Sequence, residues 1–124
     1  MSSIWSQSTE EGGGVQVIHF NDEKIIEDLK IQQIAKELNE SLDKAEKSNV
    51  LLNFDRVKFM SSAMIGKLLS IGKRCKNDKI ELKLCSITPN IMEVFKIMRL
   101  NKIFDIHDDE AKGLRAFEKK GWFG

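Results

Sequence analysis

The sequence lacks an excess of charge of either sign, a long apolar run and the pattern of a signal peptide. Its 20 lysines and arginines face 19 aspartates and glutamates, which leaves a formal net charge of +1. Such a balance gives no support for a surface that binds nucleic acid. No apolar stretch approaches the roughly 20 residues that a membrane-spanning helix needs, and the first residues show neither the charged nor the apolar region of a signal peptide. We therefore expect a cytoplasmic protein that binds neither nucleic acid nor a membrane.

Cysteine and histidine are also scarce, and they form no pattern typical of a metal site or a catalytic centre. Cys75 and Cys85 belong to no C-x-x-C pair, which predicts two small buried residues in a reducing compartment. His19 and His107 lie far apart in the chain among apolar neighbours. The sequence contains no phosphate-binding G-x-x-x-x-G-K-[ST] loop, no G-x-G-x-x-G and no G-x-S-x-G elbow. We therefore predict a protein that is not an enzyme and that holds no cofactor and no metal.

The segment from Val50 to Leu69 organises the rest of the chain. It opens with Val50-Leu51-Leu52, a short apolar run typical of a strand that is buried on both faces. Further along, the apolar residues change to helical spacing, at Ile65, Leu68, Leu69, Gly72 and Cys75. Ser61 and Ser62 lie where the strand region gives way to the helix. A hydroxyl at this place can accept a hydrogen bond from an unpaired backbone N–H of the first turn.

Strands and helices alternate along the remaining chain. We expect strands near residues 4–9, 15–20, 50–52, 80–84 and 103–106, and helices near 31–47, 61–76, 88–98 and 108–120. This order predicts one α/β domain over residues 1–124, with a mixed, mostly parallel sheet of about four to five strands and about four helices. Its core spans about residues 15–117, with an N-terminal edge strand at 4–9 and a C-terminal tail at 119–124.

Two details of these elements can be tested. Thr88 and Pro89 suit the cap and the first position of the third helix, whose predicted buried face consists of Ile91, Val94, Phe95 and Met98. Before the first helix, Ile25, Ile26 and Leu29 fit either the helix or a separate turn, and the sequence leaves both readings open.

The serine pair carries a resemblance to a known family. F-M-S-S-A-M-I-G at Phe59–Gly66 resembles the F-M-D-S-S-G-L-G signature of STAS domains, the anti-sigma-factor antagonist family. The preceding N-F-D-R-V-K matches the family's spacing without a gap. The segment Lys83–Ile106 resembles the family's "C-x-[IL]-[ST]-P, then a helix ending in L-x-K-[IL]-F". The resemblance covers about residues 15–117 and implies the STAS fold.

The resemblance also implies a bacterial signalling protein that regulates transcription. In this family the serine after the Asp of the signature is phosphorylated by a partner that is both a serine kinase and an anti-sigma factor, and the unphosphorylated antagonist binds that partner. The implied phosphoacceptor is Ser62, with Ser61 as the alternative, and the implied partner is a kinase of the histidine-kinase-like ATPase type. This sequence departs from the signature at Ser61, which replaces Asp, at Ala63, which replaces the second serine, and at Met64, which replaces glycine.

The implied partner-binding surface is the first turn of this helix together with a loop before the first helix. Its predicted residues are Asn21, Asp22, Ser61, Ser62, Ala63, Met64 and Lys67. Phosphate would add about 1.5–2 negative charges there, which a helix N-terminus tolerates and a packed interface does not. Two alternatives remain: a constitutive STAS scaffold in which the serines only cap the helix, and a STAS domain that binds a small anion or a nucleotide. The oligomeric state, monomer or homodimer, also stays open.

Overall fold

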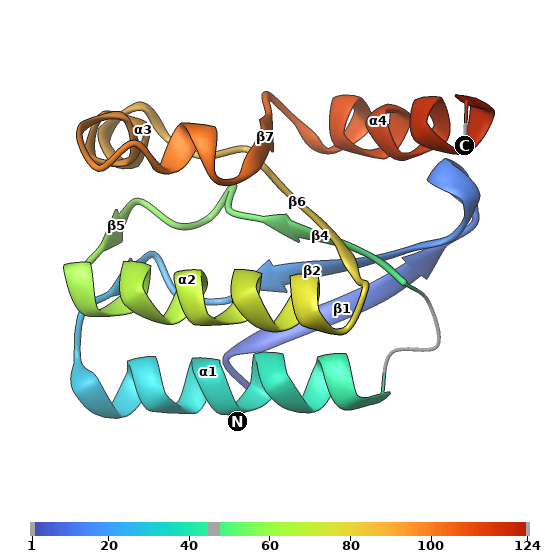
Figure 1. The fold of residues 1–124 in the computed structure, drawn as a ribbon. Coiled ribbons are helices and arrows are strands. Elements are labelled where there is room, and N and C mark those ends of the chain that lie inside the picture. The colour runs from blue at the N-terminus through green and yellow to red at the C-terminus, as the bar shows by residue number, and fades with distance from the viewer. Residues whose placement is uncertain (1, 45–47, 124) are drawn as a thin grey trace.

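The computed structural model describes residues 2–44 and 48–123, and its elements follow the predicted alternation (Figure 1). A five-stranded sheet has the order β1-β2-β4-β6-β7. Only β1 and β2 pair antiparallel, and the other neighbours are parallel, as predicted. The strands of this sheet are β1 (Ile4–Thr9), β2 (Val15–Phe20), β4 (Asn49–Asn53), β6 (Glu81–Cys85) and β7 (Asp105–His107).

Four helices surround the sheet. They are α1 (Asp28–Lys44), α2 (Ser62–Asn77), α3 (Pro89–Ile97) and α4 (Glu110–Phe123), with short 3-10 turns η1 (Glu11–Gly13) and η2 (Leu100–Lys102). Helices α1 and α2 lie side by side on one face, and α4 lies on the opposite face (Figure 1). Helix α3 lies beside η2 and near β5 (Phe59–Met60). The described parts contain no helix that is long and apolar enough to cross a membrane.

The central strand β4 is buried on both faces, as its apolar run predicted. Val50 and Leu52 face the main core under α1 and α2, whereas Leu51 belongs to a second cluster under α4. The second cluster consists of Val15, Val17, Leu51, Cys85, Leu114 and Phe117. Each fully buried side chain of this size contributes about 1.5–3 kcal/mol of hydrophobic stabilisation. The sheet is therefore fixed from both sides, and the loops at its ends can carry function.

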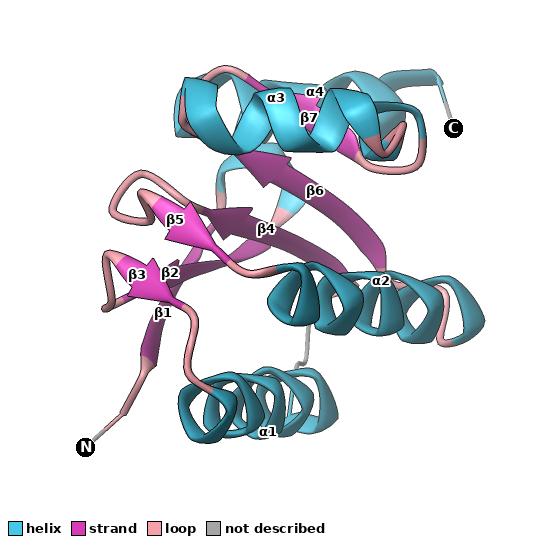
Figure 2. Ribbon diagram, turned by 90° about the vertical axis from the view of Figure 1, so that its left-hand side faces the viewer, coloured by secondary structure: helices cyan, strands magenta, loops and turns pink. Residues whose placement is uncertain are grey.

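A second, very short sheet was not expected from the sequence. β3 (Lys24–Ile25) pairs in parallel with β5, which lies directly before α2 (Figure 2). Ile25 is buried in β3, which settles one of the residues left open before the first helix. Ile26 and Leu29, by contrast, are 49% and 79% exposed, so neither belongs to the core.

Several predicted boundaries and faces were wrong. In α3 only Ile91 and Phe95 are buried, whereas Val94 and Met98 are 40% and 43% exposed, because this short helix contacts the core along one narrow edge. The last strand begins at Asp105, after η2 and the exposed Ile103.

The predicted ends of the chain's helices also differ from the structure. Helix α4 continues to Phe123, through residues predicted as a tail, and Gly124 lies outside the described residues. The predicted end of the first helix near residue 47 also falls outside them, since the structure describes α1 to Lys44.

Strand β6 is buried on both of its faces, although its alternation predicted one exposed face. Lys83 is only 4% exposed, because α4 covers this face. Its ammonium group donates a hydrogen bond to Asp105, lies 3.5 Å from the Glu81 carboxylate and lies 5.0 Å from the centroid of the Phe117 ring. A buried lysine is tolerated here because it is paired.

Candidate functional site

Ser61 is the N-cap of α2, as its place in the sequence predicted. Its backbone is extended, with φ −76° and ψ 164°, and its Oγ accepts a hydrogen bond from the Met64 N–H at 3.3 Å. The Ser61 carbonyl accepts the next bond, from the Ile65 N–H at 3.1 Å. Both groups of Ser61 therefore hold the first turn of the helix closed.

Ser62 is the first residue of α2, and it is exposed. Within residues 2–44 and 48–123, neither its hydroxyl nor the backbone N–H groups of Ser62 and Ala63 have a hydrogen-bond partner. Helix α2 also has no acidic residue in its first turn. The start of the helix therefore presents a free hydroxyl, two free donors and the positive end of the helix dipole.

Met64 does not lie on this surface, which corrects the prediction for its side chain. Met64 is 0% exposed and belongs to the main core. Together with Leu68, Ile71 and Cys75 it forms a buried helical face beside the predicted one. Ala63 and Lys67 are exposed as expected, so the outer side of the first turns is formed by Ser62, Ala63 and Lys67.

The β3–β5 ladder positions the segment that leads into α2. The N–H groups of Lys58 and Phe59 donate to the Glu23 carbonyl at 2.7 and 3.1 Å, and the Ser61 N–H donates to the Ile25 carbonyl at 3.0 Å. In Figure 2 the two short strands lie side by side, and β5 leads directly into α2. These bonds fix the direction in which the serine pair enters the helix.

The predicted loop residues Asn21 and Asp22 make their contacts away from the serine segment, and it is the next residue, Glu23, that bonds to the strand before α2. The Asn21 side chain bonds to the N-terminal segment, since its Nδ2 donates to the Ser2 carbonyl at 2.9 Å. Asp22 lies 3.5 Å from the ammonium group of Lys30. In the part of the chain that the structure describes, no hydrogen bond or ion pair joins either residue to Ser62.

Two exposed apolar residues beside the serine segment were missed. Phe59 is 55% exposed and Ile26 is 49% exposed. Phe59 and its register partner Lys24 both point outwards, whereas the next pair, Ile25 and Met60, is buried or half-buried. The available signal was a single phenylalanine beside polar residues, but strands of two residues are too short to show a period.

The charged side chains of the serine segment and of the first turns of α2 include one exposed ion pair and Lys67. Lys58 and Glu23 lie 3.6 Å apart, and both side chains are mostly exposed, so this ion pair contributes little to stability. Lys67 has no carboxylate partner among the described residues. An unmodified Ser62 is therefore part of a surface that carries the positive charge of Lys67 and has an aromatic edge at Phe59.

The other reactive residue types lie away from this surface. His19 stacks on Trp5, with ring centroids 4.0 Å apart, and its Nε2 lies 3.6 Å from Glu110 on the α4 side of the sheet. Both cysteines are buried as predicted. Burial raises the pKa of the Cys75 thiol to about 11 and that of Cys85 to about 12. Over the described ranges, no group of three or more histidine, cysteine or acidic side chains is arranged to hold a metal ion.

Comparisons with known proteins agree along most of the chain. The family model described as STAS domain matches residues 8–113. BtrV of Bordetella bronchiseptica, which is provisionally named an anti-sigma factor antagonist, is 29% identical over 94 residues, or 76% of this chain and 80% of that protein.

Solved structures give the same result. An anti-sigma-factor antagonist (STAS) domain protein from Planctomyces limnophilus matches with a TM-score of 0.76 and 25% identity, over 90% of this chain and 97% of its own. The Bacillus cell fate determinant SpoIIAA in its phosphorylated form matches with a TM-score of 0.62, over 90% of this chain and 99% of its own. At 19% identity, this second likeness shows the shared fold.

Proposed function

This chain belongs to the STAS domain family, and from that membership we propose that it is an anti-sigma-factor antagonist switched by phosphorylation of Ser62. The observation that carries the proposal is the different use of the two serines. Ser61 is occupied as the cap of α2, whereas Ser62 is exposed with a free hydroxyl. A kinase can reach the second hydroxyl without disturbing the fold.

The proposed partner is an anti-sigma factor that is also a serine kinase of the histidine-kinase-like ATPase type, in the cytoplasm. It binds the unphosphorylated protein over Ser62, Ala63 and Lys67, with Phe59 as an aromatic contact at the edge. An exposed aromatic side chain next to a small neutral turn is the kind of feature on which protein interfaces are centred. On this proposal the protein is a binding module, and the chemistry belongs to its partner.

Phosphorylation would change the binding surface and leave the fold intact. The partner's ATP supplies the phosphoryl group, Ser62 Oγ forms the new P–O bond, its proton passes to a base of the kinase, and ADP leaves. The free N–H groups of Ser62 and Ala63 and the helix dipole would favour the new charge by about 0.3–1 kcal/mol, and by up to about 2 when it is partly buried. The same charge placed in a packed interface costs several kcal/mol. Loss of binding is therefore the larger effect.

The departures from the family signature are compatible with this switch. Ser61 replaces an aspartate, and serine and aspartate are equally good N-caps. Met64 replaces a glycine, but its side chain lies in the core and adds no bulk to the surface that a partner would contact. SpoIIAA, a structural neighbour, is itself described in a phosphorylated form.

The test uses purified protein with candidate histidine-kinase-like ATPases encoded near its gene, and with ATP. We expect mass spectrometry to find one phosphate on Ser62, none in Ser62→Ala, and unchanged modification in Ser61→Ala at a temperature where that variant is folded. Modification of Ser61 alone would move the switch to the other serine, and no modification by any of these kinases would remove it.

Binding to the same partner tests the consequence of the switch. Ser62→Ala should bind like the wild type, because an exposed hydroxyl is replaced by a smaller neutral group. Ser62→Asp should bind at least tenfold more weakly, since about 1.4 kcal/mol corresponds to a factor of ten. Equal binding of the two variants would favour the constitutive scaffold.

A further inference from the structure

A separate pocket opens at the far half of α2. It has a volume of about 740 Å³ and is enclosed by the C-terminal half of α2, the start of β6 and the segment Ile103–Asp105 before and within β7. Ligand pockets usually measure about 300–1,000 Å³. Its lining begins at Leu69, which lies 7 residues after Ser62 (69 − 62) or about 10 Å along the helix, and Lys76, 14 residues after Ser62, lies about 21 Å away at about 1.5 Å per residue. The pocket is therefore distinct from the serine site.

The topology explains why this hollow is open. Strand β7 has three residues, and its register begins opposite Lys83. The first residues of β6 consequently extend past the edge strand, and within residues 2–44 and 48–123 no strand lies beside Leu82 on that side. Gly72 opens the opposite wall, because a Cβ at this position would lie 3.0 Å from the Phe104 ring.

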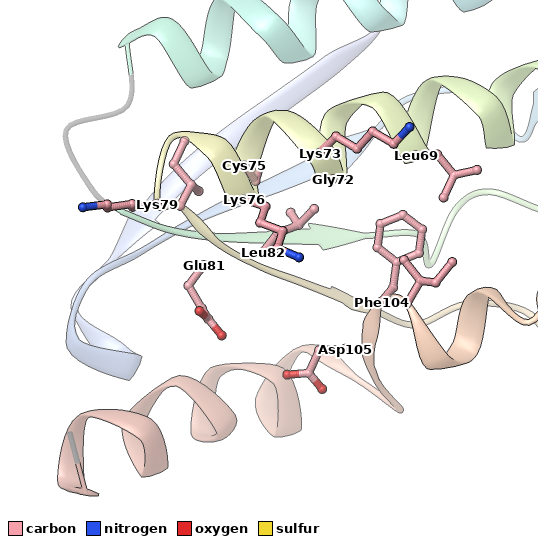
Figure 3. A pocket seen from close by; sticks show the side chains of 12 residues that line it. Leu69, Gly72, Lys73, Cys75, Lys76, Lys79, Glu81, Leu82, Phe104 and Asp105 are labelled. Atoms are coloured by element: carbon pink, nitrogen blue, oxygen red, sulfur yellow. The ribbon is translucent and has the colours of Figure 1, made fainter.

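The floor of the pocket is apolar. It is formed by the side chains of Leu69, Leu82 and Phe104, which Figure 3 shows between α2 and β6, and by the buried Cys75 beneath the helix. Leu69 and Leu82 are only half-buried, so part of this apolar surface is in contact with water. An apolar chain placed over it would remove that surface from water, which is favourable.

The rim of the pocket carries three exposed lysines. Lys73, Lys76 and Lys79 line it at spacings of three residues, and all three are exposed. Among the described residues, none of the three has a carboxylate within ion-pair distance. In Figure 3 the Lys76 side chain extends from α2 over the hollow, whereas the ammonium groups of Lys73 and Lys79 lie towards its two ends.

The two acids that line the pocket do not neutralise these lysines. Glu81 lies 3.5 Å from the buried Lys83 ammonium group, which also donates to Asp105. Burial raises the pKa of Asp105, but the hydrogen bond and charge of Lys83 and the neighbouring His107 outweigh it, so that the pKa falls below its ordinary value. Both acids thus share one buried cation, and the single negative charge that this leaves is outnumbered by the three rim lysines, so the excess charge at the rim is positive.

We propose that this pocket binds an amphiphilic carboxylate, a single apolar chain with one anionic head, such as a medium-chain or long-chain fatty acid. The chain lies over Leu69, Leu82 and Phe104, and the carboxylate accepts hydrogen bonds from the Lys76 ammonium group, with Lys73 and Lys79 adding longer-range attraction. The apolar floor supplies affinity, and the lysine rim selects for an anion. This site goes beyond the proposed switch and does not depend on Ser62.

Calorimetry on the full chain, with dodecanoate below its micellar concentration, tests the proposal. We expect saturable binding at one site, weaker binding of the uncharged dodecanol, and no binding of butyrate, which has the same head and too short a chain. Lys76→Gln should weaken dodecanoate binding by about two- to fivefold, as expected for one partly exposed ion pair, without changing dodecanol binding. Lys36→Gln, at an exposed lysine of α1 outside the pocket, is the matched control and should have no effect.

Amide chemical shifts in NMR spectra locate the site. Dodecanoate should shift the signals of residues 69–76, 80–82 and 103–105, and the pocket-filling Leu69→Trp should abolish these shifts if circular dichroism shows that the variant is folded. Absence of saturable binding would overturn the proposal. So would equal affinities of the Lys76→Gln and Lys36→Gln variants, or shifts confined to the exposed apolar residues of α3.

Discussion

Replacing Ser61 by alanine should destabilise the fold and leave the proposed phosphoacceptor in place. Ser61 Oγ accepts the Met64 N–H at 3.3 Å, and Met64 is 0% exposed, so in the folded protein this N–H is out of contact with water. Loss of a serine N-cap costs about 0.5–2 kcal/mol, and a buried donor without a partner costs about 1–3 kcal/mol. Both figures describe the same hydrogen bond and do not add. We therefore expect the free energy of unfolding to fall by about 1–2 kcal/mol.

Thermal unfolding followed by circular dichroism measures this change. For 124 residues, an unfolding entropy of about 2.1 cal/mol/K per residue gives about 0.26 kcal/mol/K, so Tm should fall by about 4–8 °C. Ser62→Ala is the matched control, since that hydroxyl is exposed and makes no hydrogen bond in the described structure. Its unfolding free energy should stay within about 0.5 kcal/mol of the wild type.

Ser61→Asp keeps a hydrogen-bond acceptor at the N-cap but removes the hydroxyl that a kinase could modify. Aspartate caps as well as serine does, and α2 has no acid in its first turn, so the new carboxylate should add about 0.3–1 kcal/mol at low salt through the helix dipole. The assignment of the two serines would be refuted if Ser61→Ala were as stable as the wild type, or if Ser62→Ala lost as much stability as Ser61→Ala.

Three further predictions concern the core and the turns. Asp105→Asn should lower the free energy of unfolding by about 1–2 kcal/mol, because it leaves the buried Lys83 with one carboxylate fewer. The Asp105 pKa is lowered in the folded protein, so this stability is present above the ordinary carboxyl range and is lost as pH falls below about 4. The urea midpoints of the variant and the wild type should therefore converge in acid. In urea unfolding, Gly12→Ala should lower the free energy of unfolding by at least about 1 kcal/mol more than Gly13→Ala does. Both glycines have positive φ, but within the described structure only a Cβ at Gly12 would meet neighbours, including the Leu114 carbonyl oxygen at 2.9 Å. Equal losses of stability in the two variants would contradict this packing. Neither cysteine should react with Ellman's reagent at neutral pH until urea unfolds the chain. Both thiols are buried, and fewer than about one in a thousand is ionised. Rapid reaction of the native protein would show that one of them is accessible.

Much of the main sheet could be predicted because its signals are local. The apolar run at Val50–Leu52 has no polar member, which is typical of a strand covered on both sides. The start of α2 was predictable for the same reason, since a serine before a run at helical spacing is an N-cap signal. The burial of Met64 was also encoded, in the spacing of Met64, Leu68, Ile71 and Cys75, which is a second helical stripe beside the one first identified.

The remaining features depend on residues that are distant in the sequence. Lys83 alternates with leucines like any residue on a solvent-facing strand face, and only the packing of α4 buries it. The β3–β5 ladder has two residues in each strand, and such short strands form only because their neighbours hold them together. The lysine-rimmed pocket exists because β7 is shorter than β6, and the boundaries of an element are the part that a sequence predicts least well.

The small β3–β5 ladder gives the protein a built-in reporter. Three amide protons, those of Lys58, Phe59 and Ser61, are held by the carbonyls of Glu23 and Ile25, outside the main sheet. Short ladders of this kind open more often than central strands do. A partner seated over the start of α2 should therefore slow deuterium uptake at these three amides, while the central strands exchange at an unchanged rate.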